Sequence, residues 1–183
     1  MEPAGELLFG ECAFDIERGE LKRNGQPVRL TSGELALLGT YLDVSGLLSK
    51  TSLTPTEQQV VLLSASYENE CHYCMAAHTT VAKGAGVAAD VLEAIRAGQP
   101  IDDAKLEALR RFTALVTVNR GWVDEAEVEA LLAAGYDRRT ILDVILGVSL
   151  KTISNYVNHF ADTPVDDAFA ANAWTPPGKE AAA

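Results

Sequence analysis

Helix start and stop signals follow one another closely from Thr31 to Ala161, and they constrain the fold more than any other feature of the chain. Thr54-Pro-Thr-Glu57 has the pattern of a capping box with proline at the first helical position, which predicts a helix through about Tyr67. Glycines follow several apolar segments, as expected where helices end. We therefore expect a mainly α-helical fold with helices near 31–48, 54–67, 71–83, 87–97, 102–119, 124–134, 137–161 and 166–173.

The longest expected helix follows Asp137, and its first part is unusually apolar. Residues 141–150 include seven large aliphatic side chains in ten. A helix that is apolar all round is normally buried, so we expect this one at the centre of the helical domain. The shorter helices do not suffice to cover it on every side, which predicts a homo-oligomer in which neighbouring subunits complete the cover.

The N-terminal residues have a different pattern, with short alternating segments typical of strands. We expect strands at 7–9, 13–16, 20–23 and 27–30, the last two joined by Asn24-Gly25, a strong hairpin signal. The expected organisation is a strand segment over residues 1–30, a helical domain over 31–174 and a disordered tail over 175–183.

Composition narrows the classes of partner. With 183 residues, 48% of them hydrophobic, one sizeable core is expected, and the net charge of −11 argues against nucleic acid as a partner. No signal peptide or apolar run of about 18 residues is present, so a cytoplasmic protein without a membrane partner is expected. Three cysteines suit a redox pair with Cys12 left as an inert strand residue, rather than a secreted disulfide framework.

The segment Cys71-His-Tyr-Cys74-Met-Ala-Ala-His78 is the main candidate for chemistry. Its two thiols and the imidazole of His78 fall within about 60° of one helical face, so a disulfide can close with a base one turn away. A helix that begins near Cys71 would also stabilise a thiolate with its free amide groups. A zinc site and a pair of buried core thiols are the alternatives, and no fourth ligand is spaced for zinc.

A polar group on the last long helix is less specific. Asn155, Asn158 and His159 lie within about 100° of one side, and we favour a buried hydrogen-bond network or a subunit contact over a site.

Two resemblances follow from longer patterns. The first is carried by three segments: Thr54-Pro-Thr-Glu, Glu68-Asn-Glu-Cys-His-Tyr-Cys-Met-Ala-Ala-His78 and Leu150-Lys-Thr-Ile-Ser-Asn-Tyr-Val-Asn-His159. Together they make residues 39–174 similar to the alkylhydroperoxidase D-like branch of the carboxymuconolactone decarboxylase superfamily. This resemblance implies an all-helical fold, trimers or hexamers, and peroxide reduction by the cysteine pair. We expect neither a cofactor nor a metal. Residues 9–38 resemble the start of a response-regulator winged-helix domain, but no recognition helix or wing follows.

The resemblance also implies roles for individual residues. Cys74 matches the cysteine that peroxide oxidises, Cys71 the one that resolves it as a disulfide, and His78 the base of a proton relay. The family's relay glutamate lies twelve positions before the first cysteine, where this chain has Gln59. Among the candidate replacements Glu57, Glu68 and Glu70, we favour Glu68.

These patterns predict a thiol-dependent peroxidase that reduces hydroperoxides and is recycled by a dithiol or thioredoxin-like reductant. The alternative is a non-enzymatic redox-responsive regulator or interaction protein that uses Cys71 and Cys74 as a sensor.

Overall fold

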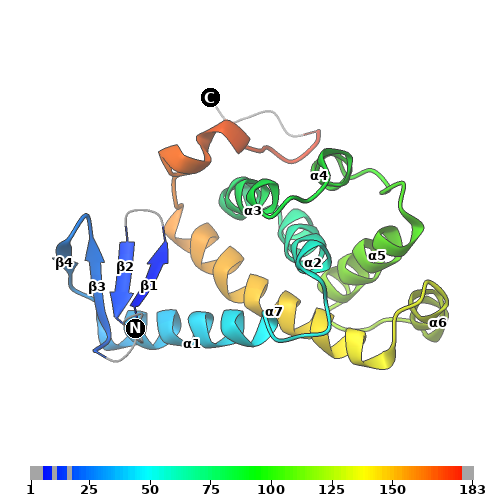
Figure 1. Cartoon of the computed structure of the whole chain (residues 1–183), viewed down its shortest axis with the longest axis horizontal. Coiled ribbons are helices and arrows are strands. Elements are labelled where there is room, and N and C mark those ends of the chain that lie inside the picture. The colour runs from blue at the N-terminus through cyan, green and yellow to red at the C-terminus, as the bar shows by residue number, and fades with distance from the viewer. Residues whose placement is uncertain (1–5, 10–11, 16–17, 179–183) are drawn as a thin grey trace. The chain divides into compact units, whose positions relative to one another are not determined.

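The structure is a computed structural model of the chain, and it describes residues 6–9, 12–15 and 18–178 (Figure 1). It is mainly α-helical with a small antiparallel sheet at the N-terminus, which confirms the expected fold class. The chain divides into two compact units, Met1–Gly46 and Leu47–Ala183. The expected domain boundaries at residues 30 and 174 stay a prediction.

The elements are β1 (Glu6–Phe9), β2 (Cys12–Asp15), β3 (Glu20–Arg23), β4 (Gln26–Val28), α1 (Ser32–Leu48), α2 (Pro55–Glu68), α3 (His72–Gly84), α4 (Ala89–Ala97), α5 (Ala104–Val118), α6 (Glu125–Ala133), α7 (Arg138–Ala161) and the 3-10 helix η1 (Asp167–Asn172).

The first unit contains the sheet and most of α1. Its four strands form an antiparallel meander in chain order. Asn24 and Gly25 both have positive φ, 51° and 75°, which is the requirement of the two-residue type I′ turn and confirms the predicted hairpin. Ile16, in the expected second strand, lies outside the described residues. The start of α1 is stabilised by reciprocal bonds between Thr31 and Glu34, as a capping box requires.

The second unit is built around α2, which packs against α3, α5 and α7 (Figure 1). Val60, Val61 and Leu63 of α2 are completely buried. Gly147 lets α7 approach closely, because a Cβ there would lie only 2.6 Å from Cγ1 of Val61. The close crossing of α2 and α7 therefore depends on the absence of a side chain at position 147.

The apolar helix α7 is buried on one side only in the single chain. Asp143, Val144 and Gly147 face the core, whereas Leu142 is 66% exposed and Ile145 is also exposed. Residues 141–150 are thus covered on one face in the single chain, because the other helices of the described chain pack against that face. The expected cover of the remaining surface by neighbouring subunits stays a prediction. By length and composition α7 could cross a membrane, a criterion that the core helices of soluble proteins also meet.

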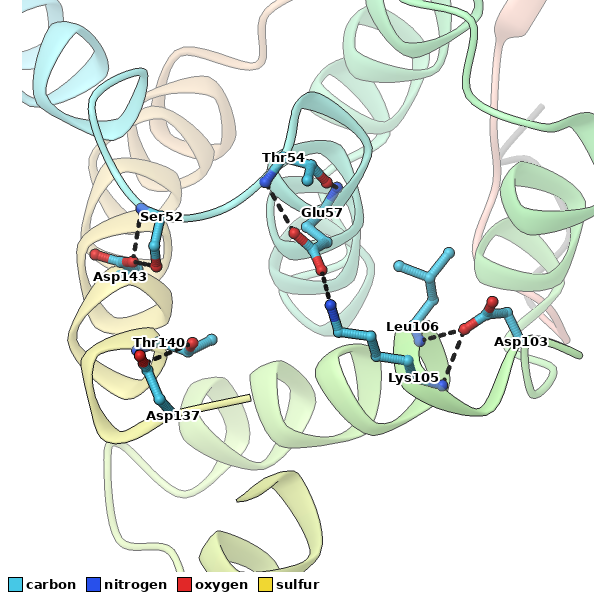
Figure 2. A network of polar contacts seen from close by, with 9 residues as sticks. All are labelled: Ser52, Thr54, Glu57, Asp103, Lys105, Leu106, Asp137, Thr140 and Asp143. Atoms are coloured by element: carbon cyan, nitrogen blue, oxygen red, sulfur yellow. Dashed lines mark hydrogen bonds and ion pairs between the residues drawn. The ribbon is translucent and has the colours of Figure 1, made fainter. Parts of the chain in front are cut away.

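The N-termini of α2, α5 and α7 are stabilised by short polar contacts (Figure 2). Thr54 and Glu57 form the predicted capping box, and Glu57 also makes an ion pair of 3.0 Å with Lys105. Asp103 is the N-cap of α5 and accepts bonds from its first turn, so this helix begins slightly later than the expected residue 102. The carboxylate of Glu57 therefore has a structural role at the start of α2. The remaining contacts in Figure 2 link Asp137 with Thr140 and Asp143 with Ser52.

The C-terminal segment after α7 packs over α3 and α4. Tyr73 of α3 donates a hydrogen bond of 2.7 Å to Asp166, and its ring packs edge-on against Phe169. Trp174 is buried and donates to the backbone oxygen of Arg96 at 2.8 Å. The chain is thus anchored to the helical unit as far as Trp174. Residues 179–183 of the expected disordered tail lie outside the described residues.

Candidate functional site

The cysteine pair lies at the start of α3, as the sequence predicts. Cys71 is the N-cap residue, with an extended backbone (φ −83°, ψ 96°), and it makes no side-chain cap bond. The preceding residue, Glu70, has a φ of 54°, which turns the chain sharply between α2 and α3. Cys74 therefore stands in the first helical turn, where unpaired backbone N–H groups favour a negative charge.

The two thiols are buried and differ strongly in acidity. Both are free, and Cys71 and Cys74 are 0% and 3% exposed. A hydrogen bond from the Cys71 thiol to Cys74 lowers the pKa of Cys74 well below its ordinary value and, together with burial, raises the pKa of Cys71. These directions favour a thiolate at Cys74 and a protonated thiol at Cys71.

One face of α7 lies against Cys74. Asn158 Nδ2 donates a hydrogen bond to Cys74 Sγ over 3.3 Å, and Ser154 Oγ lies 3.9 Å from the same sulfur. The bond from Asn158 further favours the thiolate. The sequence analysis did not assign Asn158 to the site, because its amide resembled those of a core network.

Lys151 is a functional candidate that the sequence analysis missed. Its side chain is completely buried. Its positive charge contributes to the lowered pKa values of Cys74 and His78 and opposes the rise in the pKa of Cys71. Nζ nevertheless makes no hydrogen bond of standard length within the described part of the chain. The available signal was its position on the same helical face as the buried residues Val144 and Gly147.

His78 lies beside Gln59, the residue for which the resemblance predicted a relay glutamate. Nδ1 of His78 is 3.2 Å from Oε1 of Gln59. Since a carbonyl oxygen only accepts, Nδ1 carries the proton and Nε2 keeps the lone pair that a base needs. Burial, reinforced by the charge of Lys151, holds the pKa of His78 well below its ordinary value. The imidazole is therefore neutral at physiological pH.

The candidate glutamates Glu57 and Glu68 interact with residues other than the two cysteines. Glu68 is half-buried; burial raises its pKa, and its charged neighbour is Arg110. Glu57 is engaged by Thr54 and Lys105, and Glu70 is exposed. The role expected for Glu68 stays a prediction.

The other polar residues of α7 differ in their surroundings. Asn155 is fully buried and accepts a hydrogen bond of 2.9 Å from Asn69, while its own amide donates to Ser66. For Asn155 this is the buried network that the sequence favoured, whereas Asn158 contacts Cys74. His159 is exposed. In the described ranges, no group of three or more His, Cys, Asp or Glu side chains could hold a metal ion.

Comparisons with known proteins agree on the helical unit. Residues 37–113 match the carboxymuconolactone decarboxylase family. An uncharacterized peroxidase-related protein from Silicibacter sp. TM1040 is 22% identical, with a TM-score of 0.63 over 76% of this chain and 73% of that one. The alkylhydroperoxidase AhpD core of an uncharacterized peroxidase-related protein from Ralstonia eutropha JMP134 is 24% identical, with a TM-score of 0.58 over 71% of each chain. These structures share the fold of the chain.

The comparisons have clear bounds. No curated protein matches the chain. The expected resemblance of the N-terminal segment to a response-regulator domain finds no support in them. The family match includes α2 and the cysteine motif, but it ends before α7, which contributes Lys151 and Asn158 to the site.

Proposed function

We propose that this protein is a thiol-dependent peroxidase that reduces hydroperoxides through Cys74 and Cys71. The observation that carries the proposal is the position of Cys74 in the first turn of α3, where Asn158 donates a hydrogen bond to its sulfur and the pKa of Cys74 is lowered while that of Cys71 is raised. Only the thiolate is nucleophilic, and a neighbouring thiol is required to trap its oxidised form. The family match over residues 37–113 and the peroxidase-related names of two proteins with this fold support the same chemistry.

The proposed reaction has two steps. The Cys74 thiolate attacks the terminal oxygen of the hydroperoxide; the O–O bond breaks, giving a sulfenic acid and an alkoxide that takes up a proton to become the alcohol. The Cys71 sulfur then attacks the Cys74 sulfur, forming the disulfide and releasing water. Because the pKa of Cys71 is raised, this second step needs a base, and the neutral imidazole of His78 is suited to accept the proton.

A complete cycle also needs an external reductant. The disulfide takes two electrons from a dithiol or thioredoxin-like partner, which returns Cys71 and Cys74 to thiols. A reducing compartment such as the cytoplasm suits this cycle. We also propose a homo-oligomer, a trimer or hexamer, because Leu142, Ile145 and Phe160 leave apolar surface exposed on α7 of the single chain.

Turnover with peroxide tests the proposal. Hydrogen peroxide and an organic hydroperoxide should be consumed catalytically by a Cys12→Ser protein supplied with a dithiol. Cys74→Ser should abolish consumption, whereas Cys71→Ser should complete one oxidation and leave a sulfenic acid on Cys74 that mass spectrometry detects. His78→Ala should slow turnover by about 10²-fold.

The same assay separates the enzyme from the redox-sensor alternative. A sensor would be oxidised once per chain without turnover, and a protein that reacts with only one equivalent of peroxide in excess dithiol would contradict the enzymatic proposal. Oxidation confined to Cys12 in the unmodified chain would contradict both.

A further inference from the structure

The site contains a buried cation without a conventional partner. Lys151 is 0% exposed, and within the described residues its Nζ makes no hydrogen bond of standard length and forms no ion pair with a carboxylate. Burying an unpaired ammonium is costly, and buried lysines are normally paired or neutral. Some other group must therefore compensate the charge if Lys151 is protonated.

The geometry of α7 directs Lys151 to the cysteine pair. Lys151, Ser154 and Asn158 are spaced i, i+3 and i+7, so they share one helical face. Ser154 and Asn158 lie 3.9 and 3.3 Å from Cys74 Sγ. Lys151 stands one turn earlier on that face. Burial lowers the pKa of its ammonium group, and the interactions with Cys74 and Cys71 oppose this effect by favouring the charged form.

Among the groups near Lys151, the Cys74 thiolate is the one that can act as its counter-ion, because the others are uncharged or paired with another cation. From α3 these are Cys71, a protonated thiol, the neutral imidazole of His78, and Cys74. From α2, the side chain beside His78 is the uncharged amide of Gln59. Glu57 is paired with Lys105, and the charged neighbour of Glu68 is Arg110.

We propose that Lys151 is a positioning residue that acts through Cys74, as the buried counter-ion that keeps this sulfur ionised in the reduced protein. The inference rests on the proposed function in assigning the attack on peroxide to Cys74. It has a redox consequence: closing the Cys71–Cys74 disulfide removes the anion and leaves Lys151 uncompensated. The ion pair therefore stabilises the reduced form, and the disulfide becomes a stronger oxidant.

Ultraviolet absorbance of the thiolate tests the pair directly. In a Cys12→Ser background, absorbance near 240 nm is titrated against pH for the parent protein and Lys151→Met. Loss of a cation at close range should raise the titration midpoint of Cys74 by about 1–3 pH units. The equilibrium with dithiothreitol at pH 7 should shift towards the disulfide by about 10- to 10³-fold, in proportion to that change.

Lys83→Met is the matched control. Lys83 lies on α3 but bonds Asn172 of the C-terminal segment, so its loss should leave the thiolate midpoint unchanged. Lys151→Met should fold, because an apolar chain of similar length replaces a buried amine that makes no hydrogen bond of standard length within the described residues. Lys151→Gln provides a second folded variant, with the same rise expected.

Because the titration uses no peroxide, it tests the Lys151–Cys74 ion pair independently of the proposed peroxidase activity. A parent protein that titrates as expected but lacks turnover would refute the peroxidase and retain the ion pair. A midpoint that moves by less than about half a pH unit in folded Lys151→Met would overturn the inference. If neither Lys151 variant folds, the unfolding temperatures of two cysteine variants test the ion pair instead. Cys74→Ser should lower the unfolding temperature more than Cys71→Ser does, because it leaves the ammonium group of Lys151 without its counter-ion. Equal unfolding temperatures would also overturn the inference.

Discussion

Gln59→Glu restores a carboxylate beside His78, and its effect on the acidity of the imidazole can be worked out from the structure. Nδ1 of His78 lies 3.2 Å from Oε1 of Gln59, so a glutamate in the same rotamer would accept the same bond with a full negative charge. An opposite charge at this range raises the pKa of histidine by about 1–3 units. Position 59 is only half-buried, and we therefore expect about one unit, or about 1.4 kcal/mol in favour of the imidazolium.

The sign of the stability effect follows from proton linkage. In the native protein the pKa of His78 lies well below that of the unfolded chain, so unfolding takes up a proton in acid. Stability is therefore fully present above the unfolded value, near 6.5, and falls as the pH drops below it. Gln59→Glu raises the pKa of His78 in the native protein and so brings it closer to the value in the unfolded chain. The variant should therefore lose less stability than the parent between about pH 6.5 and 5.

Proton NMR measures the change directly. The chain contains three histidines, so replacing His72 and His159 with glutamine leaves the His78 ring signals alone for titration. Gln58→Glu is the matched control, because Gln58 donates to the backbone oxygen of Leu53 instead of contacting His78. An unchanged or lower His78 midpoint in Gln59→Glu would refute the reasoning. If His78 is the catalytic base, the acid limb of the pH–rate profile should move up by the same amount.

Three further outcomes are expected. Gly147→Ala should destabilise the protein by about 1–3 kcal/mol in thermal or denaturant unfolding, because its Cβ would stand 2.6 Å from a valine methyl of α2. Gly84→Ala is the control, because a Cβ at position 84 would have no neighbouring atom within 4 Å among the described residues, and equal losses of stability would contradict the packing argument. Glu68→Gln should reduce peroxide turnover by about 10²-fold if Glu68 replaces the relay glutamate, with Glu70→Gln as the comparison; full activity removes Glu68 from the mechanism. Leu142→Arg should reduce the subunit number in light scattering, and a monomeric parent protein at micromolar concentration would exclude the oligomer.

Interactions between near neighbours explain what the sequence alone determined. The capping box of Thr54 and Glu57 spans three residues, and the Asn24-Gly25 turn depends on two backbone conformations. The placement of Cys71 and Cys74 at the start of a helix is equally local. Such features can be predicted because the groups that satisfy them lie within one turn of chain.

The acidity of the site was decided by tertiary structure. Cys74 receives its bond from Asn158, 84 residues away, and its counter-charge from Lys151, neither of which the cysteine motif specifies. Conversely, Glu68 is close to Cys71 in sequence, yet its charged neighbour in space is Arg110. The exposure of Leu142 likewise depends on which helices pack against α7. Periodicity identifies the apolar residues of a helix, but only the packed fold determines which faces are covered and which charges meet.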